Sequence, residues 1–342
     1  MKRLLTVFFL TFAAVLSAQV VNEIAPDPSA KPAETRTTAK PAKNDISYSD
    51  SVVLGLVEGL TEYLPVSSTG HLILANSFLG LDDEEPLVDA NGDAILNKNF
   101  EPLTLKAAAD AYAIVIQLGA IFAVAIIYWE SLLKMLFGLI GKNPEGLRLL
   151  RNLIAAFLPA AIVGLFAYDF IERVLFGVVP VIAALFFGAV LMVVVQRRFD
   201  KANAFACTRF TKLSDMKVRS ALLVGILQCV AMWPGTSRSM MTIIGGYAAG
   251  LKPADSAKFS FLLGLITLSA ASLFKIVKDG DAVLRAISVG PLCLGMFVAF
   301  VAAAVSVKWF VGFLTRRGLV PFAYYRILLA ALLAGLLYFN LI

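Results

Sequence analysis

Charged residues are scarce in this sequence, which restricts the kind of protein that it encodes. Only 16% of the 342 residues are Asp, Glu, Lys or Arg, whereas 59% are hydrophobic and the mean hydropathy is +0.81. A soluble globular domain is roughly 45–50% apolar. The composition therefore indicates an integral membrane protein.

Cysteine is also rare, and its arrangement predicts neither a metal site nor disulfides. Cys207, Cys229 and Cys293 lack both the spacing of zinc ligands and the even number of a disulfide framework. We interpret them as small buried hydrophobic residues. The net charge of +6 does not indicate a nucleic-acid partner, because the basic residues lie in short segments between apolar runs, where membrane proteins keep orienting charges.

The N-terminal part of the chain has the features of an export signal followed by a linker. A basic start and an apolar run over residues 4–16 precede small residues near Ala18, which predicts a signal peptide over residues 1–18. Residues 19–46 are rich in Pro, Ala, Lys and Thr and predict a disordered extracytoplasmic tether. Residues 47–342 would then form the membrane domain.

Six apolar segments are long enough to cross a membrane as helices. A hydrocarbon core of about 30 Å requires roughly 20 helical residues. We place the spans near residues 107–128, 150–168, 177–196, 257–277, 286–309 and 322–341.

Two further apolar stretches, near residues 50–79 and 219–250, are interrupted midway by polar clusters. The clusters are Pro-Val-Ser-Ser-Thr-Gly at residues 65–70 and Pro-Gly-Thr-Ser-Arg-Ser at residues 234–239. Unwound backbone at membrane depth is tolerated only inside protein or beside a water-filled cavity. We therefore expect two re-entrant helix hairpins with functional turns.

The two interrupted stretches also resemble each other. Leu-Gly-Leu-Val-Glu at residues 54–58 parallels Val-Gly-Ile-Leu-Gln at residues 224–228, and the polar clusters align after a one-residue slip. One hairpin and three spans per copy would invert the second copy. The predicted fold class is an all-α polytopic membrane protein with six transmembrane helices and two re-entrant hairpins in an inverted repeat, with halves of about 47–196 and 217–342.

Loop charges predict the orientation of this fold. The loop over residues 82–101 is rich in Asp and Glu, whereas residues 197–219 are rich in Arg and Lys. Because basic loops stay in the cytoplasm, we place the acidic loop and both termini outside.

Glu58 and Glu62 lie one helical turn apart and share a face. A charged side chain at the centre of an apolar span costs roughly 2.5–3.5 kcal/mol on insertion scales and usually serves a partner, a pathway or a metal. The alternative, carboxylates solvated at a helix end, is disfavoured by apolar neighbours such as Leu60 and Leu64.

His71 is the only histidine in the chain and follows the hydroxyl residues Ser67, Ser68 and Thr69. On a helix, Ser68 and His71 at positions i and i+3 can meet as a nucleophile and its base. Free N–H groups at the start of that helix would also favour a bound phosphate. The alternative is an ordinary buried histidine.

Arg238, in the second polar cluster, is the matching cation. A guanidinium within an apolar hairpin needs an anionic partner, and its planar fork suits phosphate oxygens. The alternative is an internal ion pair with Glu58 or Glu62, and both can hold when no substrate is bound.

Other polar residues could complete a phosphate site. A glycine in the second cluster would let the backbone approach a ligand, and the hydroxyls around it add donors. Gln117, alone in the first full span, is a further donor or simply an interhelical hydrogen-bonding residue. The cluster residues are Gly235, Thr236, Ser237 and Ser239.

These motifs resemble the undecaprenyl-diphosphate phosphatases of the bacitracin-resistance type. The resemblance rests on Glu-Gly-Leu-Thr-Glu-Tyr-Leu-Pro-Val-Ser-Ser-Thr-Gly-His at residues 58–71 and on Pro-Gly-Thr-Ser-Arg-Ser at residues 234–239, with Ile-Gln-Leu-Gly at 116–119 as a weaker third element. It extends over roughly residues 51–342. One departure is Met-Met at residues 240–241, where the family usually has Gly and a small residue, and this bears on the packing behind the second cluster.

The resemblance implies hydrolysis of undecaprenyl diphosphate to undecaprenyl phosphate and phosphate, which recycles the carrier of cell-wall synthesis at the bacterial inner membrane. It implies a polyprenyl diphosphate substrate amid membrane lipid and a divalent cation, Mg²⁺ or Ca²⁺, for which we expect Glu58 and Glu62 to be the metal ligands. The oligomeric state stays open, a homodimer included. The residues that correspond to the family's catalytic positions are Glu58, Glu62, Ser68, His71 and Arg238.

Three mechanisms stay open at this point. Ser68 attacks with His71 as base while Arg238, Ser237 and the metal neutralise the diphosphate; or His71 attacks; or a metal-activated water attacks without a covalent step. Type-2 phosphatidic-acid phosphatases share a short Ser-Gly-His element but need a second histidine, which is lacking here. A transporter or flippase of a phosphorylated polyprenyl lipid is the rival from another class, since inverted repeats with broken helices are typical of transporters.

Overall fold

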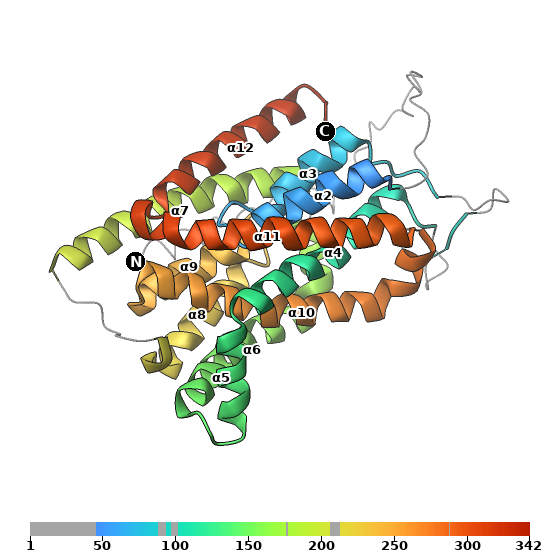
Figure 1. Cartoon of the computed structure of the whole chain (residues 1–342). Coiled ribbons are helices and arrows are strands. Elements are labelled where there is room, and N and C mark those ends of the chain that lie inside the picture. The colour runs from blue at the N-terminus through green and yellow to red at the C-terminus, as the bar shows by residue number, and fades with distance from the viewer. Residues whose placement is uncertain (1–45, 88–93, 97–101, 176, 206–212, 287) are drawn as a thin grey trace.

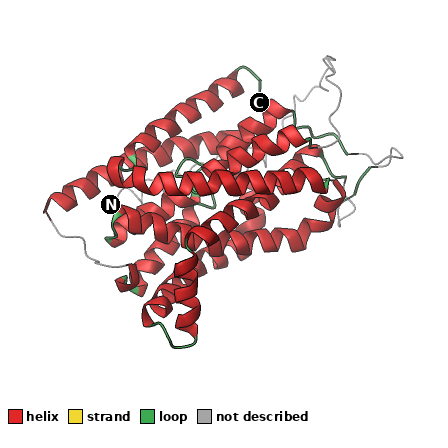
Figure 2. Cartoon of the chain, viewed as in Figure 1, coloured by secondary structure: helices red, strands yellow, loops and turns green. Residues whose placement is uncertain are grey.

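The computed structural model describes residues 46–87, 94–96, 102–175, 177–205, 213–286 and 288–342. Within these ranges the regular structure is helical, apart from two isolated β-bridges, Pro86 with Thr104 and Leu96 with Pro102 (Figure 2). The predicted signal peptide and, except for Ile46, the predicted tether lie outside the described residues.

Six helices are long and apolar enough to cross a membrane, which confirms the predicted number within the described ranges. Their ends differ from the predicted ones, because a helix continues past its apolar run until a residue disfavours helical backbone. The fifth long helix, for example, ends at Arg317, directly before Gly318, whose φ is +67°. The helices are α4 (Leu105–Ile127), α6 (Pro144–Leu175), α7 (Val178–Phe205), α10 (Pro253–Ala286), α11 (Val289–Arg317) and α12 (Val320–Tyr338).

Two pairs of short helices replace continuous spans where the polar clusters occur. Each helix has 12 to 14 residues, which at 1.5 Å per residue gives about 18–21 Å, too short for a hydrocarbon core of about 30 Å. In Figure 1 both pairs turn part-way along the bundle. They are α2 (Tyr48–Thr61) with α3 (Ser68–Leu79), and α8 (Val218–Val230) with α9 (Arg238–Ala249).

The two turns share one backbone design. Ser67 and Ser237 both have positive φ angles, 74° and 75°, and each side-chain oxygen accepts a hydrogen bond from the backbone N–H three residues on. This serine cap starts the second helix of each pair. Gly80 and Gly250 end those helices in the left-handed conformation.

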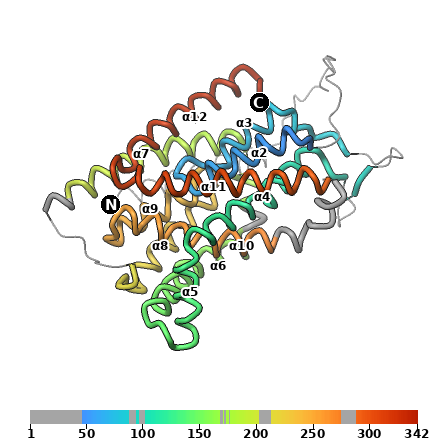
Figure 3. Tube along the Cα trace, in the orientation of Figure 1, coloured from blue at the N-terminus to red at the C-terminus, as the bar shows by residue number. Residues whose placement is uncertain are grey.

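Each first short helix packs closely against a long one. α2 lies along α11, and α8 lies along α6; Figure 3 shows α2 and α11 side by side. A Cβ atom on Gly55 would lie 2.6 Å from the carbonyl oxygen of Gly295, and one on Gly225 would collide with the carbonyl of Ala156. Small residues allow this approach, as is usual between membrane helices.

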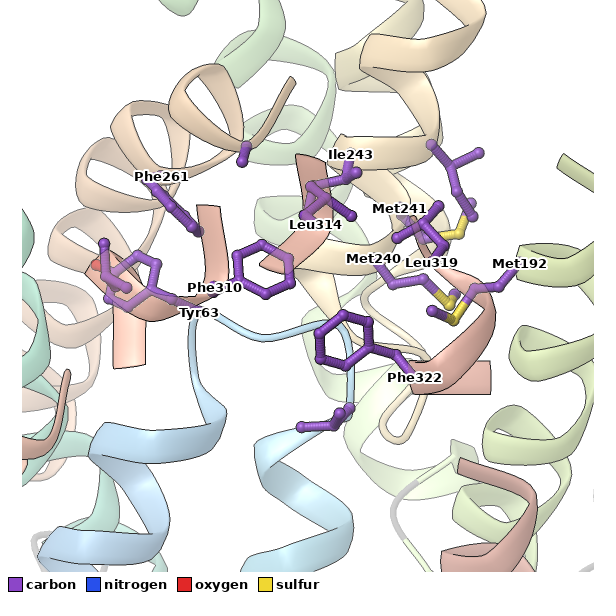
Figure 4. Packing of buried hydrophobic residues seen from close by; sticks show 14 of the residues in the cluster. Tyr63, Met192, Met240, Met241, Ile243, Phe261, Phe310, Leu314, Leu319 and Phe322 are labelled. Atoms are coloured by element: carbon purple, nitrogen blue, oxygen red, sulfur yellow. The ribbon is translucent and has the colours of Figure 1, made fainter. Parts of the chain in front are cut away.

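The main hydrophobic core surrounds the two turns. Figure 4 shows Phe310 and Phe322 stacked edge to face, 5.2 Å between ring centroids, beside the two methionines that depart from the family pattern. Met240 and Met241 are both 0% exposed. Long flexible side chains thus fill the space behind the second turn that smaller residues would leave.

The acidic loop before α4 is anchored where the structure describes it. Leu87, Ile95 and Leu103 exchange backbone hydrogen bonds of 2.7–2.8 Å, and Leu87 and Leu103 are buried. The Lys106 ammonium, 2.7 Å from the Glu84 carboxylate, holds the pKa of that exposed carboxyl below its usual range.

A further helix, α5 (Trp129–Leu139), was not predicted. It continues the direction of the chain after α4 and packs against the start of α6, where a Cβ on Gly138 would collide with the backbone of Leu147.

Candidate active site

Two buried carboxylates form the centre of the site. Glu58, on α2, is 1% exposed, and Glu62, which caps the C-terminal end of α2, is 8% exposed. The backbone N–H of Glu62 donates to the carbonyl of Glu58, so the two side chains are one turn apart as predicted. Both are too buried to be solvated at a helix end.

Gln117 connects α4 to this centre. Its side-chain nitrogen donates to Oε1 of Glu58 at 3.1 Å. This contact confirms the interhelical hydrogen bond that we considered, and it brings the third sequence motif to the first. The amide stabilises a carboxylate that would otherwise lack a partner in the apolar interior.

Arg238, at the start of α9, is paired with Glu62. Its Nη2 donates to Oε1 of Glu62 at 3.1 Å, and Nη1 donates to the carbonyl of Ser260 at 3.0 Å. The guanidinium carbon lies 5.1 Å from the centroid of the Tyr63 ring, a cation–π contact. A Cβ on Gly264 would collide with the guanidinium, so a glycine makes room for it.

Arg238 also has a hydrogen-bond donor that none of these contacts uses. Its Nε is buried and has no hydrogen-bond partner among the described residues. Buried N–H groups of this kind are normally satisfied, so an unpaired one at a predicted phosphate site points to an acceptor that the protein itself does not supply.

Ser68 belongs to the same cluster. Its hydroxyl donates to Oε2 of Glu62 at 2.8 Å. Glu62 therefore lies between the cation and the hydroxyl, with one carboxylate oxygen for Arg238 and the other for Ser68.

His71 is held by other partners than Ser68. Its Nδ1 lies 2.7 Å from the carbonyl oxygen of Ser67, and its Nε2 lies 2.6 Å from the hydroxyl of Tyr325 on α12. The predicted contact between Ser68 and His71 is therefore absent. The spacing i, i+3 allowed it, but Ser68 is the first residue of α3 and reaches back across the turn to Glu62, whereas His71 faces α12.

The serines of the second turn bind the first turn. Ser239 Oγ donates to the carbonyl of Leu64 at 2.6 Å, and Ser237 Oγ lies 3.4 Å from the same oxygen. These residues thus fix the two turns to each other. The prediction that they donate to a ligand is not tested by these contacts.

Three other predicted residues have different surroundings. A Cβ on Gly235, where φ is +90°, would lie 2.7 Å from the carbonyl of Val181, so this glycine allows close approach of α7, which we had not expected. The Thr236 hydroxyl is buried without a partner in the described part of the chain. Thr69 is half-buried, and its hydroxyl forms no hydrogen bond with the described residues.

Sequence reasoning missed Arg326, on α12. This arginine is 0% exposed and donates only to backbone carbonyls: Ala184 at 3.0 Å and Leu185 at 3.3 Å on α7, Gly235 at 2.9 Å, and Pro65 at 3.5 Å. It thereby connects both turns to α7. The signal was present, because Arg326 is the only charged residue from residue 319 to the end of the sequence.

The chemistry of the two carboxylates is compatible with a divalent cation that prefers oxygen ligands. Glu58 and Glu62 supply such ligands, and within the described ranges no group of three or more Asp, Glu, His or Cys is placed to hold a metal ion. Magnesium is commonly bound through one or two carboxylates together with substrate phosphates, so two suffice.

Comparison with known proteins shows the family to which the chain is related. The family described as "Bacitracin resistance protein BacA" matches residues 51–332. An undecaprenyl-diphosphatase of Sorangium cellulosum (strain So ce56) is 42% identical over 292 residues, 84% of this chain and 85% of the relative. An undecaprenyl-diphosphatase of Clostridium tetani (strain Massachusetts / E88) is 36% identical over 292 residues, 85% of this chain and 97% of the relative.

Proposed function

Because this chain belongs to the BacA family of bacitracin resistance proteins, we propose that it is a membrane phosphatase that hydrolyses undecaprenyl diphosphate to undecaprenyl phosphate and phosphate. The observation that carries this proposal is the row formed by Arg238, Glu62 and Ser68, which places a cation, a carboxylate and a hydroxyl in contact. Phosphoryl transfer depends mainly on positioning and charge stabilisation, and this row supplies both.

Arg238 would bind the diphosphate. Its fork matches two phosphate oxygens, and the unpaired Nε gives it a donor beyond those already used by Glu62 and Ser260. The ion pair with Glu62 orients the guanidinium before substrate arrives, so little reorganisation is required.

Ser68 would be the nucleophile, with Glu62 as the group that accepts its proton. The 2.8 Å hydrogen bond to Oε2 favours Glu62 over His71 for this role. Ser68 Oγ bonds to the terminal phosphorus while the bond from that phosphorus to the bridging oxygen breaks, and undecaprenyl phosphate leaves. Water then cleaves the phosphoserine: its oxygen stays on phosphorus, one of its protons leaves, and Glu62 returns the first proton to Ser68.

Glu58 and Glu62 would hold a divalent cation, magnesium or calcium. When bound, the cation supplies positive charge that offsets the charge of the diphosphate. Gln117 donates a hydrogen bond to Oε1 of Glu58, which restrains this carboxylate.

The architecture we propose is an inverted repeat with two re-entrant hairpins. It is supported by the matching serine caps and glycine ends of the two turns, and by the exchange of partners in which α2 packs on α11 and α8 on α6. The membrane domain would begin near residue 47, after a cleaved signal peptide and tether.

We propose that the site opens to the extracytoplasmic side of the inner membrane. The support is the contrast between the acidic loop before α4 and the basic segment before α8. In Figure 1 the start of α4 and the end of α7 lie at opposite ends of the bundle, as this orientation requires.

The test is release of phosphate from undecaprenyl diphosphate by the detergent-solubilised protein, with Mg²⁺ or Ca²⁺ and after chelation. We expect release that depends on the metal and is lost in Glu62→Gln. A transporter or flippase, which the names of the relatives do not favour, would release no phosphate, and that result would refute the proposal.

A further inference from the structure

The position of the proton on His71 follows from its contacts. A backbone carbonyl can only accept a hydrogen bond, so the 2.7 Å contact with Ser67 requires that Nδ1 carries the hydrogen. In the neutral ring Nε2 then has a lone pair and accepts. The nitrogen that can take a proton or attack is therefore Nε2, on the side away from Ser67.

That nitrogen faces Tyr325 from α12. The tyrosine hydroxyl lies 2.6 Å from Nε2, and the two ring planes differ by only 5°. Because Nε2 accepts, the hydroxyl donates; if Nε2 is protonated, the same hydroxyl accepts. Tyr325 thus keeps a hydrogen bond to His71 in both protonation states. Tyr325 is 45% exposed, and its contact with Nε2 lies in an exposed part of the structure.

The site consequently contains two separate pairs of proton-handling groups. Ser68 with Glu62 forms one, and His71 with Tyr325 forms the other. Only the first pair includes the nucleophile of the proposed reaction. The hydrolysis of the phosphoserine requires a second base, which must take a proton from water.

We propose that the Tyr325 hydroxyl passes a proton from water to His71, and that this pair serves the hydrolysis of the phosphoserine and not its formation. The proposal rests on the proposed function. Water bonds to phosphorus as its proton passes to the hydroxyl oxygen of Tyr325 and the tyrosine proton passes to Nε2 of His71, and the bond between Oγ of Ser68 and phosphorus breaks. Oγ recovers its proton from Glu62, and the imidazolium later loses its proton to solvent.

Steady-state and burst kinetics with Tyr325→Phe test the inference, because this variant keeps the ring and removes only the hydroxyl. The matched control is Tyr324→Phe, since Tyr324 is the neighbouring tyrosine, is 62% exposed and has no recorded hydrogen bond in the described structure. We expect kcat of Tyr325→Phe to fall roughly tenfold to hundredfold, within or below the 10²–10⁴-fold that general acid–base catalysis contributes in full.

The distribution of this loss between kcat and KM is the decisive readout. If only hydrolysis of the phosphoserine slows, KM falls with kcat, kcat/KM stays near the wild-type value, and a burst of one undecaprenyl phosphate per enzyme precedes the steady state. A variant that merely disturbs the fold lowers kcat/KM and shows no burst. That second pattern, or kinetics of Tyr325→Phe equal to those of Tyr324→Phe, overturns the inference.

The single histidine permits a direct check that does not depend on activity. Protein labelled with ¹⁵N-histidine, and purified through a tag without histidine, gives ring signals from His71 alone. We expect a neutral ring protonated at Nδ1 in wild type and in Tyr324→Phe, and a shifted Nε2 signal in Tyr325→Phe. A ring protonated at Nε2 overturns the inference. Wild-type protein that releases no phosphate would instead refute the proposed function.

Discussion

The turn between α2 and α3 and the turn between α8 and α9 have nearly the same backbone but different chemistry. Ser67 and Ser237 start their helices with the same cap and the same positive φ. The residue that follows is a nucleophile candidate, Ser68, in one turn and a cation, Arg238, in the other. One local structure can therefore present complementary groups when two copies of it meet.

The helices that precede the two turns, α2 and α8, also carry different polar residues at equivalent positions. Glu58 of α2 corresponds in the repeat to Gln228 of α8. Glu58 receives a hydrogen bond from Gln117, whereas the Gln228 amide is buried at 3% exposure with neither polar atom paired among the described residues. At this position the first copy therefore carries an acidic residue, Glu58, and the second copy carries an amide, Gln228, for which the structure gives no role.

The largest effect is expected from removing the Glu62 carboxylate, which contacts both Arg238 and Ser68. Glu62→Gln removes both the ion pair with Arg238 and the acceptor for Ser68, so activity should fall by about 10³-fold or more, the scale of losing an electrostatic or proton-transfer group. Ser68→Ala should be similar. Because groups that act as a unit show non-additive losses, the double variant should be scarcely worse than either single one. Losses that multiply would contradict the assignment of Glu62 as the base; initial rates of phosphate release measure them.

Arg238→Lys should have the next largest effect. Lysine keeps the charge but cannot contact Glu62 and the Ser260 carbonyl together as the fork does, so we expect activity to drop by about 10²-fold, or about 2.7 kcal/mol in the activation barrier. Unchanged expression and insertion serve as the control. A turnover close to that of wild type would remove Arg238 from the phosphate site.

Arg326→Lys should weaken the connection between the turns without touching the reacting groups. A lysine cannot satisfy the carbonyls of Gly235, Ala184 and Leu185 together, and unpaired buried groups cost about 1–3 kcal/mol each. We expect a lower midpoint of thermal unfolding in detergent together with a smaller loss of activity than in Arg238→Lys. An unchanged midpoint would show that Arg326 does not hold the turns together.

The smallest effect is expected from a substitution of Gln228, whose side-chain amide has no hydrogen-bond partner among the described residues. Replacing an unpaired buried amide by an apolar group of similar size is neutral or stabilising, so Gln228→Leu should leave activity unchanged and the unfolding midpoint the same or higher. The matched variant Gln117→Leu should lower activity, because it removes the donor to Glu58. Equal effects of the two substitutions would mean that the copies do not differ in this respect.

The six membrane helices could be predicted from the sequence, because the length and hydropathy of a segment suffice to identify a span whatever its neighbours are. The sequence also determined where the short helices are interrupted, since Pro, Gly and clustered hydroxyl residues disfavour continuous helix locally. The candidate site residues stand out for the same reason, because a charged side chain such as Glu58 or Arg238 in an apolar segment is visible without knowledge of its partner.

Which side chains contact one another could not be predicted from the sequence, because it depends on how the helices pack. Ser68 and His71 share a helix and were predicted to meet. The reversal of the chain at Ser67 instead directs Ser68 to Glu62, and His71 is hydrogen-bonded to Tyr325, which lies 254 residues away in the chain. Helical periodicity determines which residues share a face, but not which helix that face meets. Arg326 shows this most clearly, because its partners are backbone carbonyls, which every residue carries and which only the packing of helices brings to one place.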